Sequence, residues 1–78
     1  MNSVVVPAYN AEKTVGVCLE GLLAQQTADT EIIVVDDGSC DATRDIAQSK
    51  GVRVLTQANR GAAAARNLGA ENARGDIV

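Results

Sequence analysis

The sequence has no histidine, tryptophan or phenylalanine, and tyrosine occurs once. Without histidine, and with Cys18 and Cys40 too far apart for a CxxC pair, it contains no plausible zinc-ligand set, and we interpret both cysteines as reduced. The net charge of −3 and the scarcity of aromatic residues argue against nucleic acid as a partner. A basic leader and a run of ~20 apolar residues are also missing. We therefore expect no membrane segment in this chain and a cytoplasmic location, and leave open whether a longer protein is membrane-associated.

Glycine is absent from the first predicted turn, Pro7 to Glu12. Dinucleotide-binding folds carry a GxGxxG pattern at this turn, because the pyrophosphate must approach the backbone closely. The missing glycines therefore argue against a classical NAD-dependent enzyme.

Short apolar runs alternate with segments of helical periodicity along the 78 residues. Runs of β-branched residues without polar alternation are typical of strands buried on both faces of a parallel sheet. The expected strands cover residues 3–6, 32–35, 52–55 and 76–78, and the expected helices cover 11–26, 42–50 and 62–73. This pattern predicts one small α/β domain with a Rossmann-like parallel sheet in βαβαβαβ order and a topological switch point beside the first strand.

The expected boundaries depend on a few residues. Pro7 should end the first strand, and Asn10 and Asp41 should cap the helices that follow them. Cys18 belongs to the apolar stripe expected to face the sheet. Gly69 interrupts an alanine-rich helix, which predicts close contact between helix and sheet because an interior glycine otherwise costs about 1 kcal/mol relative to alanine.

The most informative segment is Glu31–Ser39, in which an apolar strand ends in Asp36, Asp37 and a glycine. Ligands of open parallel sheets bind outside the carboxyl ends of the strands, so these carboxylates should border a ligand site. Adjacent side chains on extended backbone point to opposite faces, and we therefore expect one aspartate to bind a ribose or base and the other to brace the loop. The alternative is that both carboxylates merely cap the next helix.

A second candidate site residue is Arg66, within the run Gly61–Gly69. Its guanidinium interrupts a face of small residues and could reach a phosphate or stack on a base. The alternatives are a solvated surface arginine and a helix whose alanines serve only packing.

Taken in order, three segments closely resemble family 2 inverting glycosyltransferases: Val4–Asn10, Glu31–Ser39 followed by Asp41 and Thr43, and Gly61–Gly69 with the Gly-Asp-Ile-Val sequence that ends at Val78. The resemblance covers essentially the whole chain. It implies that residues 1–78 form the N-terminal, nucleotide-sugar-binding part of a GT-A domain, incomplete in this chain.

The resemblance also implies roles for individual residues. The uracil-binding aspartate of the family falls on Asp37, Pro7 and Tyr9 line the nucleotide pocket, and Arg66 matches a basic residue that contacts the nucleotide. The implied reaction is inverting transfer from a nucleotide-sugar, commonly a UDP-sugar, to an unknown acceptor, with a divalent metal (Mn or Mg). The Asp-x-Asp metal motif and the catalytic base of the family are not in these residues, so we assign no catalytic residue and no metal ligand and expect this fragment alone to be inactive.

A competing interpretation is a stand-alone nucleotide-binding or self-associating α/β module without catalysis. The last expected strand would leave an apolar edge at Ile77 and Val78. Unpaired sheet edges invite strand pairing between copies, so a homodimer through this edge is the corresponding prediction.

Overall fold

A computed structural model describes residues 1–77 of the chain. Four strands alternate with three helices: β1 (Asn2–Ala8), α1 (Val15–Gln25), β2 (Thr30–Asp36), α2 (Thr43–Ser49), β3 (Arg53–Thr56), α3 (Ala62–Asn72) and β4 (Asp76–Ile77). The strands form one parallel sheet in the order β3-β2-β1-β4. The predicted α/β class, the parallel sheet and the switch point beside β1 are confirmed, because β2 and β4 lie on opposite sides of β1. Val78, the last residue of the expected fourth strand, lies outside the described residues.

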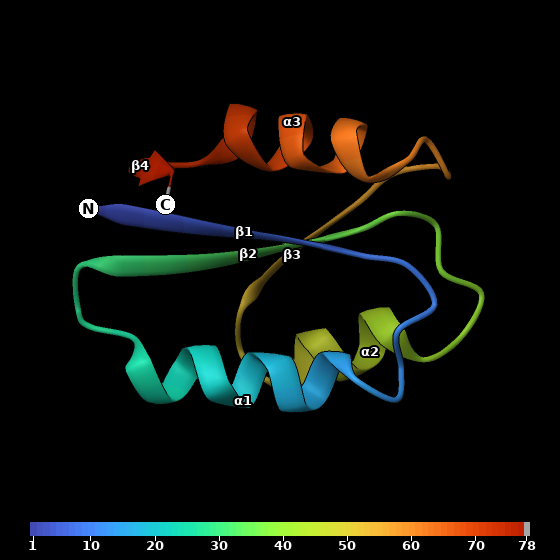
Figure 1. Cartoon of the computed structure of the whole chain (residues 1–78), viewed down its shortest axis with the longest axis horizontal. Coiled ribbons are helices and arrows are strands. Elements are labelled where there is room, and N and C mark those ends of the chain that lie inside the picture. The colour runs from blue at the N-terminus through green and yellow to red at the C-terminus, as the bar shows by residue number, and fades with distance from the viewer. Residues whose placement is uncertain (78) are drawn as a thin grey trace.

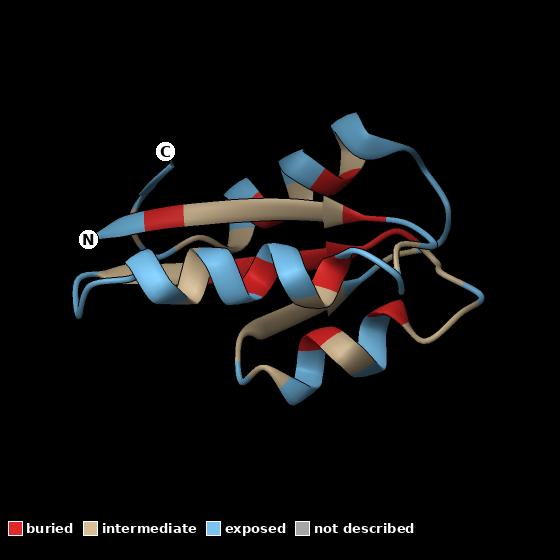
Figure 2. Ribbon diagram, turned by 60° about the horizontal axis from the view of Figure 1, so that its bottom comes forward, coloured by how far each residue is buried: buried red, intermediate tan, exposed pale blue. Residues whose placement is uncertain are grey.

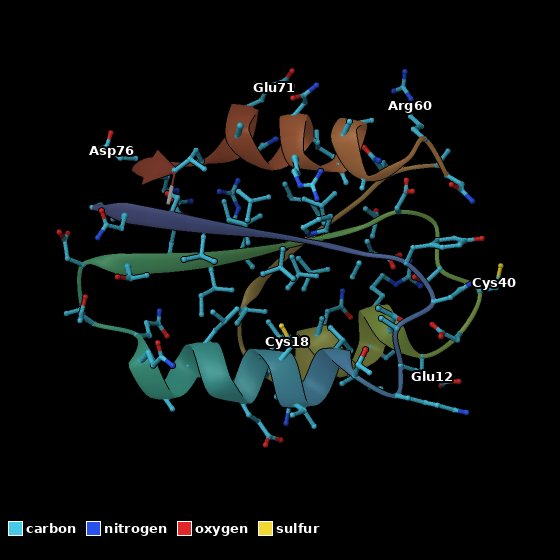
Figure 3. All side chains as sticks on the ribbon, viewed as in Figure 1. Glu12, Cys18, Cys40, Arg60, Glu71 and Asp76 are labelled. Carbon is cyan, nitrogen blue, oxygen red and sulfur yellow. The ribbon has the colours of Figure 1, made fainter. Side chains whose placement is uncertain are left out.

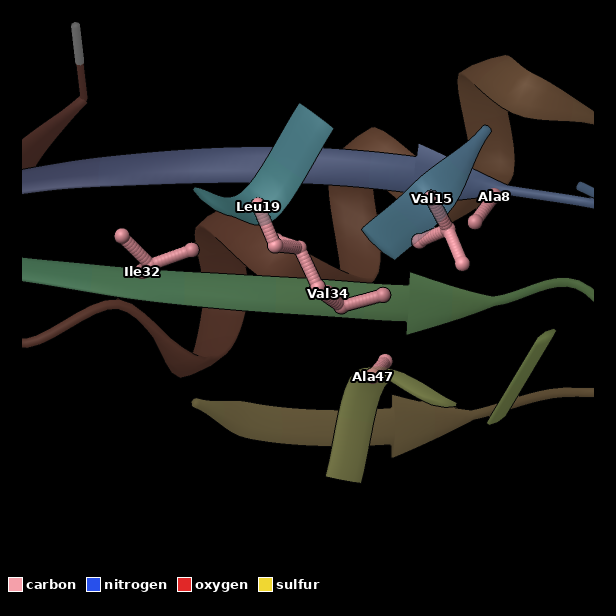
Figure 4. Packing of buried hydrophobic residues seen from close by; sticks show 6 residues of the cluster. All are labelled: Ala8, Val15, Leu19, Ile32, Val34 and Ala47. Carbon is pink, nitrogen blue, oxygen red and sulfur yellow. The ribbon is translucent and has the colours of Figure 1, made fainter. Parts of the chain in front are cut away.

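The sheet is covered on both faces, with α3 on one face and α1 and α2 on the other (Figure 1). β2 is the most buried strand: every residue from Ile32 to Asp36 is buried. Ile32 and Val34 pack toward α1 and α2 with Leu19, as Figure 4 shows. Ile33 and Val35 pack on the opposite face with Ala65 of α3. Since full burial of such a side chain contributes about 1.5–3 kcal/mol, this strand anchors both layers.

Gly69 explains how closely α3 approaches the sheet. It is buried, and a β-carbon added at this position would overlap the side chain of Val5 in β1. The close contact predicted for Gly69 is therefore confirmed.

Two predicted boundaries near the end of β1 were wrong. Pro7 does not end the strand but pairs in register with Val35. Proline is tolerated where one side of a strand is unpaired, and β4 reaches only Asn2 and Ser3. Asn10 does not cap α1, because the backbone takes a left-handed turn there (φ 48°) and the helix begins only at Val15.

The start of the second helix and the exposure of one residue in the first also differ from expectation. α2 begins at Thr43, and Asp41 stands two residues ahead of it, where its carboxylate accepts the Thr43 N–H at 2.9 Å. Cys18, expected to be part of the apolar stripe that faces the sheet, is exposed, and Cys40 is exposed as well. Figure 2 shows that burial concentrates on the sheet and on the helix faces turned toward it.

Candidate functional site

The carboxyl ends of three strands meet at one edge of the sheet, where Ala8, Asp36 and Thr56 lie in register. Backbone pairing continues one residue further on each side of β2. The Asp37 N–H donates to the Ala8 carbonyl at 2.8 Å, and the Gln57 N–H donates to the Asp36 carbonyl at 3.0 Å. These bonds fix the backbone from which the two aspartates project.

Asp37 faces the α3 side and accepts three hydrogen bonds from the loop between β3 and α3. Its Oδ1 accepts the Gln57 Nε2–H and the Arg60 backbone N–H, each at 2.8 Å, and its Oδ2 accepts the Gly61 N–H at 3.0 Å. Gly61 has φ 95°, a conformation that favours glycine and lets two successive N–H groups reach one carboxylate. The Arg60 N–H, followed by the Gln57 amide, lowers the pKa of Asp37, so this side chain is a charged acceptor at neutral pH.

A pocket of about 260 Å³ opens beside this carboxylate. Its lining contains Pro7, Tyr9, Asp37 and Arg66, the residues that the sequence predicted for the nucleotide site, together with Ala8 and Ala62. Three separate segments of the chain thus converge on one hollow: the end of β1, the end of β2 and the first turns of α3. The tyrosine is 48% exposed, which leaves its ring accessible from solvent.

Asp36 takes a different position from its neighbour. It is 3% exposed, its Oδ2 accepts the Ser39 N–H at 3.3 Å, and its Oδ1 is buried without a hydrogen-bond partner among the described residues. It does not line the pocket that Asp37 borders. The two carboxylates therefore have separate surroundings, as expected for adjacent residues of a strand.

The loops after β1 and β2 exchange hydrogen bonds in both directions. We call this contact, made by residues 10–12 with residues 39–43, the loop clamp. The Asn10 N–H donates to Ser39 Oγ at 2.9 Å, and Asn10 Oδ1 accepts the Cys40 N–H at 2.9 Å. The Ala11 N–H donates to Thr43 Oγ1 at 2.7 Å. Figure 3 shows Glu12 and Cys40 where these two loops come together.

The bonds of the loop clamp were not predicted from the sequence. Asn10 and Asp41 carry side chains typical of helix caps, and this local function was the one inferred for them. Their partners in the loop clamp lie about thirty residues away in the chain: Asn10 bonds to Cys40, and Asp41 Oδ2 accepts the Glu12 N–H at 3.3 Å. No local pattern reports such a pairing. Gln57 was also missed as a partner of Asp37, although its place directly after β3 puts it at the same edge of the sheet.

Metal ligands are not grouped in this part of the molecule. Within residues 1–77, no set of three or more histidine, cysteine, aspartate or glutamate side chains could hold a metal ion. The residues present therefore do not form a site for the divalent metal that the resemblance implies. Among the helices that the structure describes, none has the length and apolar character needed to cross a membrane.

Comparison with known proteins gives consistent matches over nearly the entire chain. The family model for "Glycosyl transferase family 2" matches residues 3–78. The uncharacterized glycosyltransferase EpsJ of Bacillus subtilis is 41% identical over 97% of this chain and 24% of its own length. Glycosyltransferase GlyG of Streptococcus pneumoniae is 45% identical over 97% of this chain and 27% of its own. The chain thus spans about a quarter of the length of these relatives.

Two solved structures have the same fold. TarS of Staphylococcus aureus (residues 1–349) superposes with a TM-score of 0.88 and 31% identity over 99% of this chain and 26% of its own. Glucosyl-3-phosphoglycerate synthase of Mycobacterium tuberculosis superposes with a TM-score of 0.80 and 30% identity, over 100% of this chain and 32% of its own. The latter structure is a complex with Mn2+, uridine diphosphate and glucosyl-3-phosphoglycerate.

Proposed function

The chain belongs to glycosyl transferase family 2, and from this premise we propose that the pocket beside Asp37 binds the nucleotide of a nucleotide-sugar donor, specifically a UDP-sugar. The observation that carries the proposal is the convergence of Pro7, Tyr9, Asp37 and Arg66 on one pocket at the carboxyl edge of the sheet. Ligands of open parallel sheets bind at this edge. The UDP complex of the structurally similar glucosyl-3-phosphoglycerate synthase supports the choice of nucleotide.

Each residue has a chemical part in the proposed site. Asp37, kept ionised by its hydrogen bonds, accepts a hydrogen bond from a ring N–H of the base. The guanidinium of Arg66 offers planar donors and a positive charge to the base or the diphosphate. The Tyr9 ring and Pro7 supply apolar surface against which the base can lie.

The reaction proposed for the whole protein is inverting transfer of the sugar to an acceptor hydroxyl. In such a transfer a carboxylate base removes the acceptor proton and a divalent metal offsets the charge on the leaving diphosphate. Neither part is assigned to residues 1–77: Asp36 and Asp37 belong to the loop and nucleotide end, and Asp76 lies in β4. We propose that this region supplies donor binding alone, within an incomplete GT-A domain, and the cytoplasmic location stays a prediction.

Titration calorimetry with UDP tests the proposal directly. Measurements with and without Mn2+, and with ADP as the control nucleotide, should give preferential binding of UDP that does not depend on the metal. The matched variant Arg66→Ala should weaken UDP by about tenfold or more, because a hydrogen bond to a charged group contributes about 1.5–3 kcal/mol. Failure of the folded chain to bind millimolar UDP, or equal binding of ADP, would contradict the proposal.

Self-association without catalysis is the alternative function, and an exposed apolar side chain favours it. Ile77, in the two-residue edge strand β4, is 51% exposed. Strand pairing between copies through this edge would cover it. Light scattering over a range of protein concentrations distinguishes the two functions: a mass that stays monomeric argues against the self-associating module.

A further inference from the structure

The carboxylate of Asp37 is almost fully occupied by the chain itself. An ionised carboxylate offers about four acceptor positions, two on each oxygen. On Asp37, Oδ1 already accepts two hydrogen bonds, from Gln57 and Arg60, whereas Oδ2 accepts only the Gly61 N–H. One acceptor position is thus left for a ligand, and it belongs to Oδ2.

Gln57 supplies the one side-chain donor among these three partners. It does not line the nucleotide pocket; with Arg60 and Asn67 it lines a separate hollow of about 200 Å³ beside α3. Its backbone is fixed by the bond from its N–H to the Asp36 carbonyl, so the amide is directed from β3 toward Asp37. The glutamine therefore reaches the carboxylate without reaching the pocket.

We propose that Gln57 is a positioning residue for nucleotide binding. Its side-chain amide, directly after β3, donates a hydrogen bond to Asp37 Oδ1, so that the remaining acceptor position, on Oδ2, is offered to the base. The inference rests on the proposed function of the pocket and adds a residue to it. An acceptor with one open position suits a base that presents a single ring N–H, as uracil does.

The other charged or titratable side chains around Asp37 come from four segments. Tyr9 and Arg66 line the same pocket as Asp37. Arg60 belongs to the loop before α3, and its backbone N–H donates to Asp37 Oδ1. Asp36 precedes Asp37 in the chain and has separate surroundings. Among the described residues, none of these four side chains donates a hydrogen bond to the Asp37 carboxylate, and the Gln57 amide does.

Two substitutions test the inference against a merely structural function. Gln57→Leu removes the donor at similar size, and Gln57→Glu puts a second carboxylate in its place. Gln48→Leu, an exposed position of α2, is the matched control. Two quantities are measured for each folded variant: the titration of the Asp37 carboxyl carbon by NMR, and the UDP affinity by calorimetry relative to wild type, so that the titration of the nucleotide itself cancels.

Gln57→Leu should raise the pKa of Asp37 toward its ordinary value and weaken UDP about three- to tenfold, as expected for one hydrogen bond of about 1 kcal/mol. Gln57→Glu should lose more affinity at about pH 8, where the two carboxylates repel, than at about pH 5, where a protonated glutamate can donate as the amide does. A purely structural loss would leave the Asp37 titration unmoved and would not recover on acidification.

The outcomes separate the two proposals. If wild type binds UDP and Gln57→Leu changes neither the titration of Asp37 nor the affinity by more than about twofold, the positioning function of Gln57 is overturned while the nucleotide site stands. If wild type binds no UDP, the proposed function is overturned, and this inference with it. A pH-independent defect in Gln57→Glu would also contradict the inference.

Discussion

Each end of β2 carries a carboxylate held by hydrogen bonds from another part of the chain, and the two carboxylates have different surroundings. At the amino end, Glu31 Oε2 accepts the Ser3 hydroxyl at 2.7 Å and the Arg74 N–H at 2.5 Å. At the carboxyl end, Asp37 accepts three N–H groups from the loop before α3. In both cases these bonds lower the pKa, led by the Ser3 hydroxyl for Glu31 and by the Arg60 N–H for Asp37.

The difference lies in what surrounds each carboxylate. Glu31 Oε1 also lies 3.8 Å from Arg53 Nη1, and Ser3 Oγ accepts the Gly75 N–H at 3.0 Å. This cluster therefore joins β1, β2 and the residues just before β4. A pocket of about 260 Å³ lies there too, as large as the one beside Asp37. It has no aromatic ring in its lining and lies at the amino edge of the strands, opposite the carboxyl edge at which open parallel sheets bind ligands. Neither a hydrogen-bonded carboxylate nor a pocket volume identifies the site by itself.

The largest expected effect comes from replacing Asp37 and Glu31 by alanine in two separate variants and comparing them. Asp37→Ala should weaken UDP by about tenfold to a hundredfold, since a hydrogen bond to a charged group contributes about 1.5–3 kcal/mol. Glu31→Ala should lower the melting temperature but leave the UDP affinity of the folded protein within about twofold. Calorimetry on both folded variants measures this contrast, and equal losses of affinity would remove the distinction between the two ends.

A smaller effect sharpens the comparison within the aspartate pair. Asp36→Ala should weaken UDP far less than Asp37→Ala does, by no more than about threefold, because Asp36 does not line the pocket. Its expected consequence is on the loop after β2, where the carboxylate accepts the Ser39 N–H. Thermal unfolding and UDP titration of the two variants separate these effects. Similar losses of affinity would mean that the assignment of Asp37 alone to the base is wrong.

The smallest expected effect is the loss of stability in acid to which both Glu31 and Asp37 should contribute. A carboxylate whose pKa is lowered by folding stabilises the protein above its ordinary pKa, and this contribution is lost as the pH falls through the lowered value. The melting temperature should therefore be nearly constant above about pH 5 and fall below about pH 4. Glu31→Gln and Asp37→Asn should each flatten this decline in circular dichroism melts. A wild-type melting temperature that rises on acidification would contradict it.

Much of the fold could be predicted because its determinants are local in the sequence. The apolar run of β2 and the alanine-rich α3 define their elements by composition, and Gly69 has a packing requirement that the surrounding helix makes visible. The strand limits were less accurate because proline and asparagine signals are ambiguous. Pro7 can lie within a strand that lacks a neighbour on one side, and Asn10 can bond across to another loop.

The four residues predicted for the nucleotide site line one pocket, and their binding function stays a prediction, whereas the hydrogen bonds inside the site were not predicted. Pro7, Tyr9, Asp37 and Arg66 could be chosen because their segments resemble a known family, and the first three also follow from strands that end at one sheet edge. The three hydrogen bonds that the chain itself donates to Asp37 could not be predicted. They depend on the φ of Gly61 and on the side chain of Gln57, directly after β3. Such geometry arises only when strands distant in the sequence are brought into register.

The loop clamp has a thermodynamic consequence for ligand binding. Fixing the backbone of one flexible residue costs about 1–2 kcal/mol at room temperature. Residues 10–12 and 39–43 are fixed by hydrogen bonds to one another in the folded chain, including the bond from Ala11 to Thr43. The entropy of ordering these two loops is therefore lost during folding and not on binding at the proposed nucleotide site. Preorganisation of this kind leaves more of the contact energy available as affinity.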